Sequence, residues 1–227
     1  MPTEELTKTD AVTVKRKRER ADYRRDSANA ILDEGLVAHV GIAVDGQPLV
    51  IPMAYGRDGD RLILHGSRVS RLLKALGDGQ PVCVTVTLVD DVVFARSQFH
   101  MSMNYRSVVV VGVPRLLADT EEKRAALEAL VEHVAPGRTA EARPATDDEL
   151  DQILAVEIPI DTASVKARTE GVIDEPEDHD LDIWAGLIPI KTVYGAPICE
   201  PDLRPGINVA PSALRYRRPT KSGKERE

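Results

Sequence analysis

The chain has 227 residues, and 42% of them are hydrophobic, which is enough to fill the core of one domain. Its formal net charge of -7 argues against a nucleic acid as the principal partner, because neutralising phosphates requires a basic surface. Cys83 and Cys199 offer neither a zinc-ligand spacing nor a disulfide framework. There is no secretory signal and no apolar run of membrane-spanning length, so we expect a cytoplasmic protein that contacts no membrane.

The N-terminal part predicts an arm, a helix and a hairpin. Residues 1–20 are charged and lack an apolar period, which favours a flexible polar arm. Apolar positions within residues 21–34 indicate a helix that ends at Gly35. Residues 36–44 and 48–55 then read as two strands joined at Asp45-Gly46, a typical two-residue hairpin turn.

Strand signals continue through the middle of the chain. We expect a third strand at residues 61–65, a fourth at 82–89, a turn at Asp90-Asp91, a fifth at 92–96 and a sixth at 105–117. Six strands with one helix inserted after the third predict a mainly β fold with flanking helices. The fold would be a small antiparallel barrel, closed or nearly closed, because closure removes exposed strand edges.

The C-terminal part predicts helices and then an extended tail. Residues 119–134 form an apolar face behind a capping signal at Asp119, and a second capping box at Thr146 and Glu149 starts a short helix. Residues 155–160 and 164–169 suggest a last hairpin. Proline, glycine and acidic residues dominate afterwards. We expect residues 191–227 to form a Pro-rich extended tail, with 215–227 disordered.

The run RLILHGSRVSRLLK, residues 61–74, is the strongest candidate for a binding site. A strand hands over to a helix through Gly66, and Ser67 stands where it could cap that helix. Free N–H groups, hydroxyls and the cations Arg68 and Arg71 would suit an anion, most naturally a phosphate. An ordinary capped helix with a solvated basic face would give the same pattern.

Residues 96–107 are rich in polar and aromatic side chains between two predicted strands. Asn104 and Ser107 could hydrogen-bond a heteroaromatic edge, Arg106 could pair with an anion, and Tyr105 could cover a ring. The alternative is a packed loop whose polar groups satisfy one another. Trp184 either covers a flat ligand or anchors the tail.

His65, beside the predicted phosphate turn, is the best candidate for proton transfer or ligand polarisation. It is equally compatible with a packing role, which we prefer for His39, His100 and His133. His65 and His100 could also ligate haem iron, although their spacing does not require it. Dinucleotide, phosphate-loop, serine-hydrolase and zinc-protease motifs are all absent from the sequence.

Four segments together resemble the flavin-binding split barrels of the pyridoxamine 5'-phosphate oxidase group, in the branch of flavin-nucleotide-binding and nitroimidazole-resistance-related proteins. The segments are LHGSxxSR (residues 64–71), FARSxFHxSMNYRSV (94–108), PGR (136–138) and WAGxxP (184–189). The resemblance spans about residues 23–189. It implies a six-stranded Greek-key split barrel over residues 21–190, and a homodimer with FMN at the interface.

The resemblance also implies which residues contact FMN. Ser67, Ser70 and Arg71 would hold the phosphate together with Gly66 and Lys74, and Ile51, Pro52 and Met53 would lie along the isoalloxazine beside His65. The segment Asn104, Tyr105, Arg106 and Ser107 would reach the flavin or its phosphate, and Trp184 would close the site.

The sequence departs from the vitamin B6 oxidases in two places. A second basic residue usually follows the one matching Arg71, and here it is Leu72, so Lys74 or Arg68 would have to substitute. The Arg-rich C-terminal pattern is not evident either, which weighs against vitamin B6 oxidation. We therefore expect an FMN-dependent oxidoreductase acting on a small flat substrate. The alternatives are a non-catalytic flavin or haem binding or sensing protein, and a deazaflavin-dependent reductase.

Overall fold

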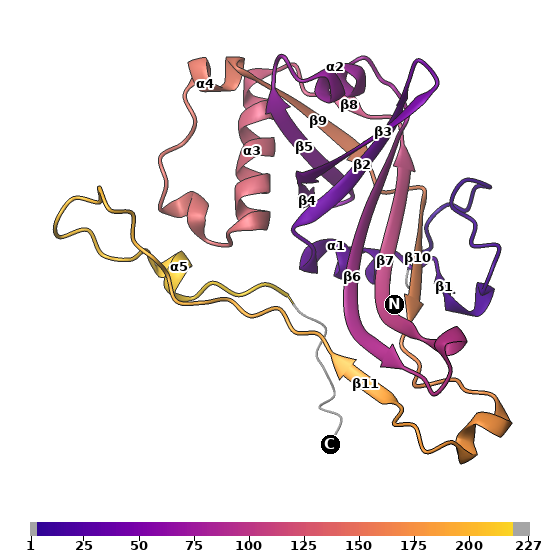
Figure 1. The fold of residues 1–227 in the computed structure, drawn as a ribbon. Coiled ribbons are helices and arrows are strands. Elements are labelled where there is room, and N and C mark those ends of the chain that lie inside the picture. The colour runs from indigo at the N-terminus through magenta and orange to yellow at the C-terminus, as the bar shows by residue number, and fades with distance from the viewer. Residues whose placement is uncertain (1–3, 220–227) are drawn as a thin grey trace.

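The computed structural model describes residues 4–219 and is mainly β (Figure 1). Its strands are β1 (Ala21–Asp22), β2 (Val37–Val44), β3 (Gln47–Ala54), β4 (Gly56–Asp58), β5 (Arg61–Ser67), β6 (Val82–Phe94), β7 (Ser102–Gly112), β8 (Arg115–Leu116), β9 (Ile153–Pro159), β10 (Ala163–Arg168) and β11 (Gly186–Pro189). Its α-helices are α1 (Arg25–Glu34), α2 (Arg71–Gly77), α3 (Thr120–Val134), α4 (Asp147–Asp151) and α5 (Pro211–Leu214). Within these residues no helix has both the length and the apolar composition needed to cross a membrane.

The strands form two antiparallel sheets. The larger has the order β1-β10-β7-β6-β2-β3, with β11 paired to β6, and the smaller has the order β4-β5-β9-β8. The chain passes from one sheet to the other several times, so the two sheets share one core as a split barrel. The mainly β, antiparallel barrel predicted from the sequence is confirmed, although it is built from more strands than the six expected.

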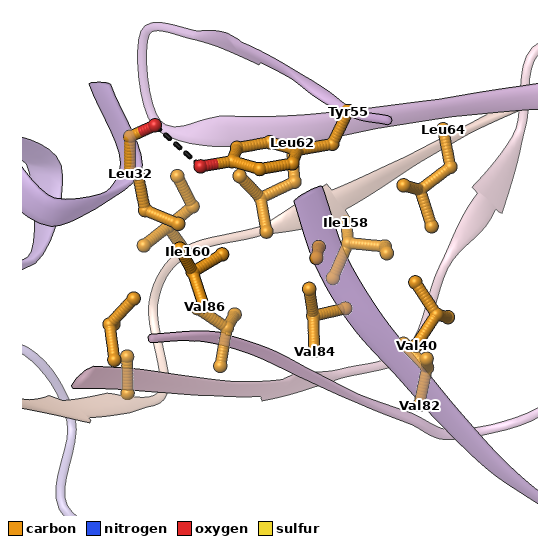
Figure 2. Close-up of a cluster of buried hydrophobic side chains, with 14 of the residues drawn as sticks. Leu32, Val40, Tyr55, Leu62, Leu64, Val82, Val84, Val86, Ile158 and Ile160 are labelled. Carbon is orange, nitrogen blue, oxygen red and sulfur yellow. Dashed lines mark hydrogen bonds between the residues drawn. The ribbon is translucent and has the colours of Figure 1, made fainter. Parts of the chain in front are cut away.

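Alternating valines on β6 meet leucines and isoleucines of the smaller sheet in that core (Figure 2). The residues labelled there are all at most 2% exposed: Leu32, Val40, Tyr55, Leu62, Leu64, Val82, Val84, Val86, Ile158 and Ile160. Burying each such side chain contributes about 1.5 to 3 kcal/mol relative to leaving it in water. The Tyr55 hydroxyl donates to the Leu32 carbonyl over 2.6 Å, which satisfies one of the last carbonyls of α1.

The turn predicted at Asp90-Asp91 is wrong, because β6 continues through it with a register shift between Val89 and Asp91. Asp90 and Asp91 can remain inside the strand because the carboxylate of each has a partner on β7. Arg106 lies 2.7 Å from Asp90, and the Asn104 amide donates to Asp91 over 2.8 Å. A β-bulge therefore replaces the expected turn.

Strand pairing contradicts two further predictions, the start of the first helix and the last hairpin. Residues 21–22 form β1 against β10, so α1 begins only at Arg25 rather than at residue 21. The expected last hairpin does not form, since β9 pairs with β5 while β10 pairs with β7 in the other sheet. Residues 160–162 cross between the sheets instead of making a tight turn.

Residues 4–20, which the sequence predicts to be a loose arm, contact the barrel. Leu6 and Val12 are buried, the Leu6 N–H donates to the Tyr23 carbonyl over 2.8 Å, and Thr7 bridges to Thr162. At the other end, Tyr216 and Arg218 bond to the ends of α3 and α1, contrary to the predicted disorder of residues 215–219. The rest of that prediction, on residues 220–227, lies outside the described residues.

Gly56 provides a test of how α3 packs on β4. A Cβ atom at this position would lie 2.7 Å from the Leu130 Cα atom, a contact that only a backbone shift can relieve. We expect Gly56→Ala to lower the free energy of unfolding by about 1 to 3 kcal/mol, or roughly 2 to 4 °C of melting temperature per kcal/mol. Gly171→Ala is the matched control, because nothing lies within 4 Å of its Cβ position. Equal melting temperatures for the two variants, measured by calorimetry, would contradict this packing.

Candidate functional site

The junction between β5 and α2 gathers the predicted phosphate ligands. β5 ends at Ser67, and a turn closed by the Ser70 N–H to the Ser67 carbonyl, 2.9 Å long, leads into α2. The N-cap is therefore Ser70, whose hydroxyl accepts from the Leu73 N–H over 3.3 Å, and the capping role predicted for Ser67 is wrong. The Arg68 N–H is bonded to the Gln152 carbonyl, which keeps residue 68 out of the helix.

Helix α2 turns its apolar side into the core and its basic side outward. Leu72, Leu73 and Leu76 are at most 2% exposed, whereas Arg71 and Lys74 lie on the surface. In the described part of the chain no carboxylate forms an ion pair with Arg71 or Lys74. The junction therefore presents two cations without internal partners.

The other hydrogen-bond donors at the junction differ in whether they already have a partner within the chain. The Arg68 guanidinium donates to the Asp151 carbonyl over 2.8 Å and is already engaged. The main-chain N–H groups of Arg71 and Leu72 have no hydrogen-bond partner among the described residues, as expected for the first turn of a helix. Because α2 has only seven residues, its dipole would contribute less to binding an anion than the cations and the free N–H groups. This donor set fits a phosphate dianion.

His65 lies on β5 opposite Ala155, half-buried at the entry to this junction. Its Nδ1 atom is buried without a hydrogen-bond partner in the part of the chain that the structure describes. Burial lowers the pKa of His65 below its ordinary value, so the ring is neutral near pH 7 and has a lone pair to offer. Gly66 follows His65, and a Cβ at this position would lie 3.4 Å from the Leu73 side chain, an ordinary van der Waals contact.

Strand β3 carries the residues predicted to lie along a flavin. Ile51 and Met53 pack against the core, while Pro52 is exposed. Because β3 is the last strand of its sheet, one side of its main chain is left unpaired by the ladder. Ligand contact at this strand would therefore involve the backbone and Pro52 more than the side chains of Ile51 and Met53.

Asn104 and Arg106 are engaged within the chain. Arg106 lies 2.5 Å from Glu34 and 2.7 Å from Asp90, which joins β7 to α1 and β6. The fully buried Asn104 amide donates to Asp91 and to the Glu170 carbonyl, and its oxygen accepts from Arg168. Their side chains hold the fold together here.

The remaining predicted ligands are Tyr105, Ser107 and Trp184. Tyr105 is half-buried opposite Arg168 in the ladder, and the Ser107 hydroxyl donates to the Lys166 carbonyl over 3.1 Å. Trp184 is 63% exposed and rests at 5.7 Å on the Phe94 ring, measured between centroids.

The predicted ligands thus fall into two groups within one chain. His65, Gly66, Ser67, Ser70, Arg71 and Lys74 share the β5–α2 junction. Trp184 precedes β11, which pairs with residues 91–94 of β6, where Asn104 is also bonded. Figure 1 places α2 and β11 at opposite ends of the molecule, so a single chain does not unite the groups.

Sequence reasoning missed Glu34 and Arg168 as partners of this second group. Arg168 is 3% exposed and donates to the Glu170 and Gly171 carbonyls as well as to Asn104. A charged residue ending a predicted strand gives no signal of burial, since arginine at strand ends is ordinarily solvated. Only the pairing of β10 with β7 shows that Arg168 lies beside Asn104.

The capping assignment can be tested by comparing two serines. We expect Ser70→Ala to lower the free energy of unfolding by about 1 kcal/mol, because the Leu73 N–H loses its acceptor. Ser67→Ala should change it by less than about half of that, since its hydroxyl accepts only one 3.4 Å bond from the Val69 N–H. Urea unfolding curves measure both values. A larger loss for Ser67→Ala would reverse the assignment.

Comparisons with known proteins now identify the class. Residues 24–167 match the family model described as pyridoxamine 5'-phosphate oxidase, which covers more than half of the chain. The chain therefore belongs to the pyridoxamine 5'-phosphate oxidase family, and the resemblance inferred from its motifs is confirmed. No curated protein matches the sequence.

Two solved structures are similar over nearly the whole chain. The flavocytochrome Anf3 from Azotobacter vinelandii is 36% identical with a TM-score of 0.87, and the match covers 92% of this chain and 97% of that one. An FAD and haem binding protein from Mycobacterium smegmatis is 39% identical with a TM-score of 0.82, covering 85% and 95%. A putative 5-nitroimidazole antibiotic resistance protein from Bacteroides thetaiotaomicron, 24% identical with a TM-score of 0.55 over 65% and 86%, shares the fold.

Proposed function

We propose that this protein binds a flavin nucleotide at the β5–α2 junction and acts as an oxidoreductase. The observation that carries the proposal is the pair of exposed cations, Arg71 and Lys74, beside the free N–H groups of Arg71 and Leu72. Membership of the family supports it. So do the two relatives above 35% identity, which are described as a flavocytochrome and as an FAD and haem binding protein.

Each part of the junction has a role in this proposal. Arg71 and Lys74 bind the phosphate of the nucleotide, and the hydroxyls of Ser67 and Ser70 are the further polar groups around it. The unpaired edge of β3 offers main-chain groups to the polar rim of the ring system. The bound flavin supplies hydride or electron transfer, while the protein sets its orientation and access. The sequence predicts FMN; FAD has the same phosphate next to its ribityl chain and fits the same donors.

A homodimer is part of the proposal. The Trp184 group lies far from α2 within one chain, and association of two copies is the simplest way to complete a site from both groups. Exposed apolar side chains near Trp184 favour burial on association: Phe94, Phe99, Met101, Met103 and Ile183. A small flat substrate and a cytoplasmic location stay predictions from the sequence.

Arg71→Ala tests the phosphate contact. A charge-assisted hydrogen bond contributes about 1.5 to 3 kcal/mol, so we expect flavin affinity to fall by roughly one to two orders of magnitude. Ser70→Ala should weaken binding less. Arg18→Ala is the control, because within the described part of the chain the exposed Arg18 side chain bonds only to the Lys15 carbonyl. Fluorescence titration with FMN and with FAD measures the dissociation constants, and identical values for Arg71→Ala and Arg18→Ala would remove the assignment.

Haem binding is a second candidate function, and the descriptions of the two relatives favour it. His65 is the candidate ligand, since its ring is neutral near pH 7; because its Nδ1 atom is buried, the Nε2 atom would have to bind the iron. His100 is less suited because its Nε2 atom lies 3.3 Å from Glu175. A deazaflavin would need further basic residues, and Arg68 is already engaged.

His65→Ala tests this second candidate. If His65 ligates haem iron, the purified variant should lose or shift the Soret band while its flavin absorption remains. His179→Ala is the matched control, because His179 is exposed on the short 3-10 helix Pro176–Asp180 that follows β10. An unchanged Soret band in His65→Ala would exclude His65 as the ligand. A protein without a Soret band after addition of haemin would exclude haem binding itself.

A further inference from the structure

Arg218, near the C-terminus, is 6% exposed and bonds to the barrel through its whole guanidinium group. It donates to the carbonyls of Asp33 over 2.6 Å, of Gly35 over 2.8 Å and of Glu34 over 3.3 Å, and also to the carbonyl of His133. An arginine this buried is unusual unless its donors are satisfied, and here four carbonyl oxygens satisfy them.

These carbonyls belong to the ends of two helices. Asp33 and Glu34 are the last residues of α1, Gly35 is its C-cap, and His133 lies in the last turn of α3. The final carbonyls of a helix lack intrahelical partners and attract a cation. One guanidinium therefore closes two helix ends at once and fixes them against each other.

The imidazole of His133 adds a fifth contact, with its Nε2 atom 3.1 Å from the Arg218 guanidinium. The same nitrogen lies 3.2 Å from the Gly35 carbonyl. Since arginine can only donate and a carbonyl can only accept, the tautomer of the neutral ring decides which of these two bonds Nε2 makes. Burial, and then the charge of Arg218, lower the pKa of His133 to about 4. The ring therefore stays neutral beside the cation at physiological pH.

The residues before Arg218 dock on the same end of α3. The Tyr216 hydroxyl donates to the Val134 carbonyl over 2.7 Å, and the Ser212 N–H donates to Glu141 over 2.9 Å. We call residues 211–218 the clasp. Both bonds lie within a few residues of the helix end that Arg218 holds.

Residues 190–210, which we call the strap, are held differently. β11 fixes the N-terminal end of the strap to β6, and the clasp fixes its C-terminal end. In between, Val193 is 84% and Ile198 is 96% exposed. The strap runs as an extended segment past the end of α3 (Figure 1). It lines a cavity of about 630 Å³ between Ala135 and Arg138 on one side and Tyr194 and Tyr216 on the other.

We propose that Arg218 is a latch, which docks the clasp on the ends of α1 and α3 and thereby holds the strap in place along this cavity. The strap has few contacts of its own, so its position depends on the two ends. Losing the latch would free the chain from the end of β11 onward while leaving the sheets intact.

The test is hydrogen exchange of the full-length protein, followed by mass spectrometry of its peptides. In Arg218→Ala we expect the amides of residues 211–217 to exchange about tenfold faster or more, since several charge-assisted bonds are lost. Peptides from β6 and β7 should keep their protection. Arg217→Ala is the matched control, because among residues 4–219 its exposed guanidinium bonds only to the Tyr216 carbonyl. Equal exchange of residues 211–217 in the two variants would overturn the proposal.

A second variant keeps the test decisive if Arg218→Ala does not fold. Tyr216→Phe removes one hydroxyl bond to α3 and leaves the guanidinium in place, so exchange of the clasp should rise severalfold without loss of the barrel. Wild-type exchange rates of the clasp in Tyr216→Phe, together with an unfolded Arg218→Ala, would mean that Arg218 acts on the whole fold and would overturn the latch.

Discussion

The burial of three leucines along one side of α2 is the constraint on which the candidate site depends. Once Leu72, Leu73 and Leu76 pack into the core between the sheets, the opposite side of the helix must face outward, and it carries Arg71 and Lys74. The cost of moving the leucines into water is several kcal/mol, far more than a surface charge pair contributes. The hydrophobic core therefore fixes the charges where an anion can reach them.

Ion pairs inside the larger sheet explain why the second group of motif residues is not free to bind a ligand. Arg106 joins α1, β6 and β7 through Glu34 and Asp90, so its charge is neutralised within the chain. Asn104 is similarly enclosed. Motif residues of one family thus divide into cations that are left free for a ligand and polar groups that hold the scaffold. In the proposed dimer, the scaffold would present Trp184 and its apolar surroundings to a second copy.

Local signals were predictable from the sequence and distant partners were not. The Asp45-Gly46 turn follows from local backbone preference, and both residues have positive φ, at 50° and 74°. The capping box of Thr146 and Glu149 is likewise present. By contrast, Asp90-Asp91 reads as a turn until Arg106 and Asn104 are brought beside it. The burial of Arg218 depends on helix ends more than 80 residues away in the sequence. The proposed anion site combines both cases: its residues are local, but the choice of Ser70 over Ser67 as cap depends on a contact of Arg68 with Gln152.

The central claim is that the β5–α2 junction grips the phosphate of a flavin, and the cofactor of the native protein tests it most directly. The absorption spectrum of the purified protein, with mass spectrometry of whatever heat or acid releases from it, identifies that cofactor. The account predicts a yellow protein that releases about one FMN or FAD per chain. A colourless protein that takes up neither nucleotide when each is added in excess would contradict it.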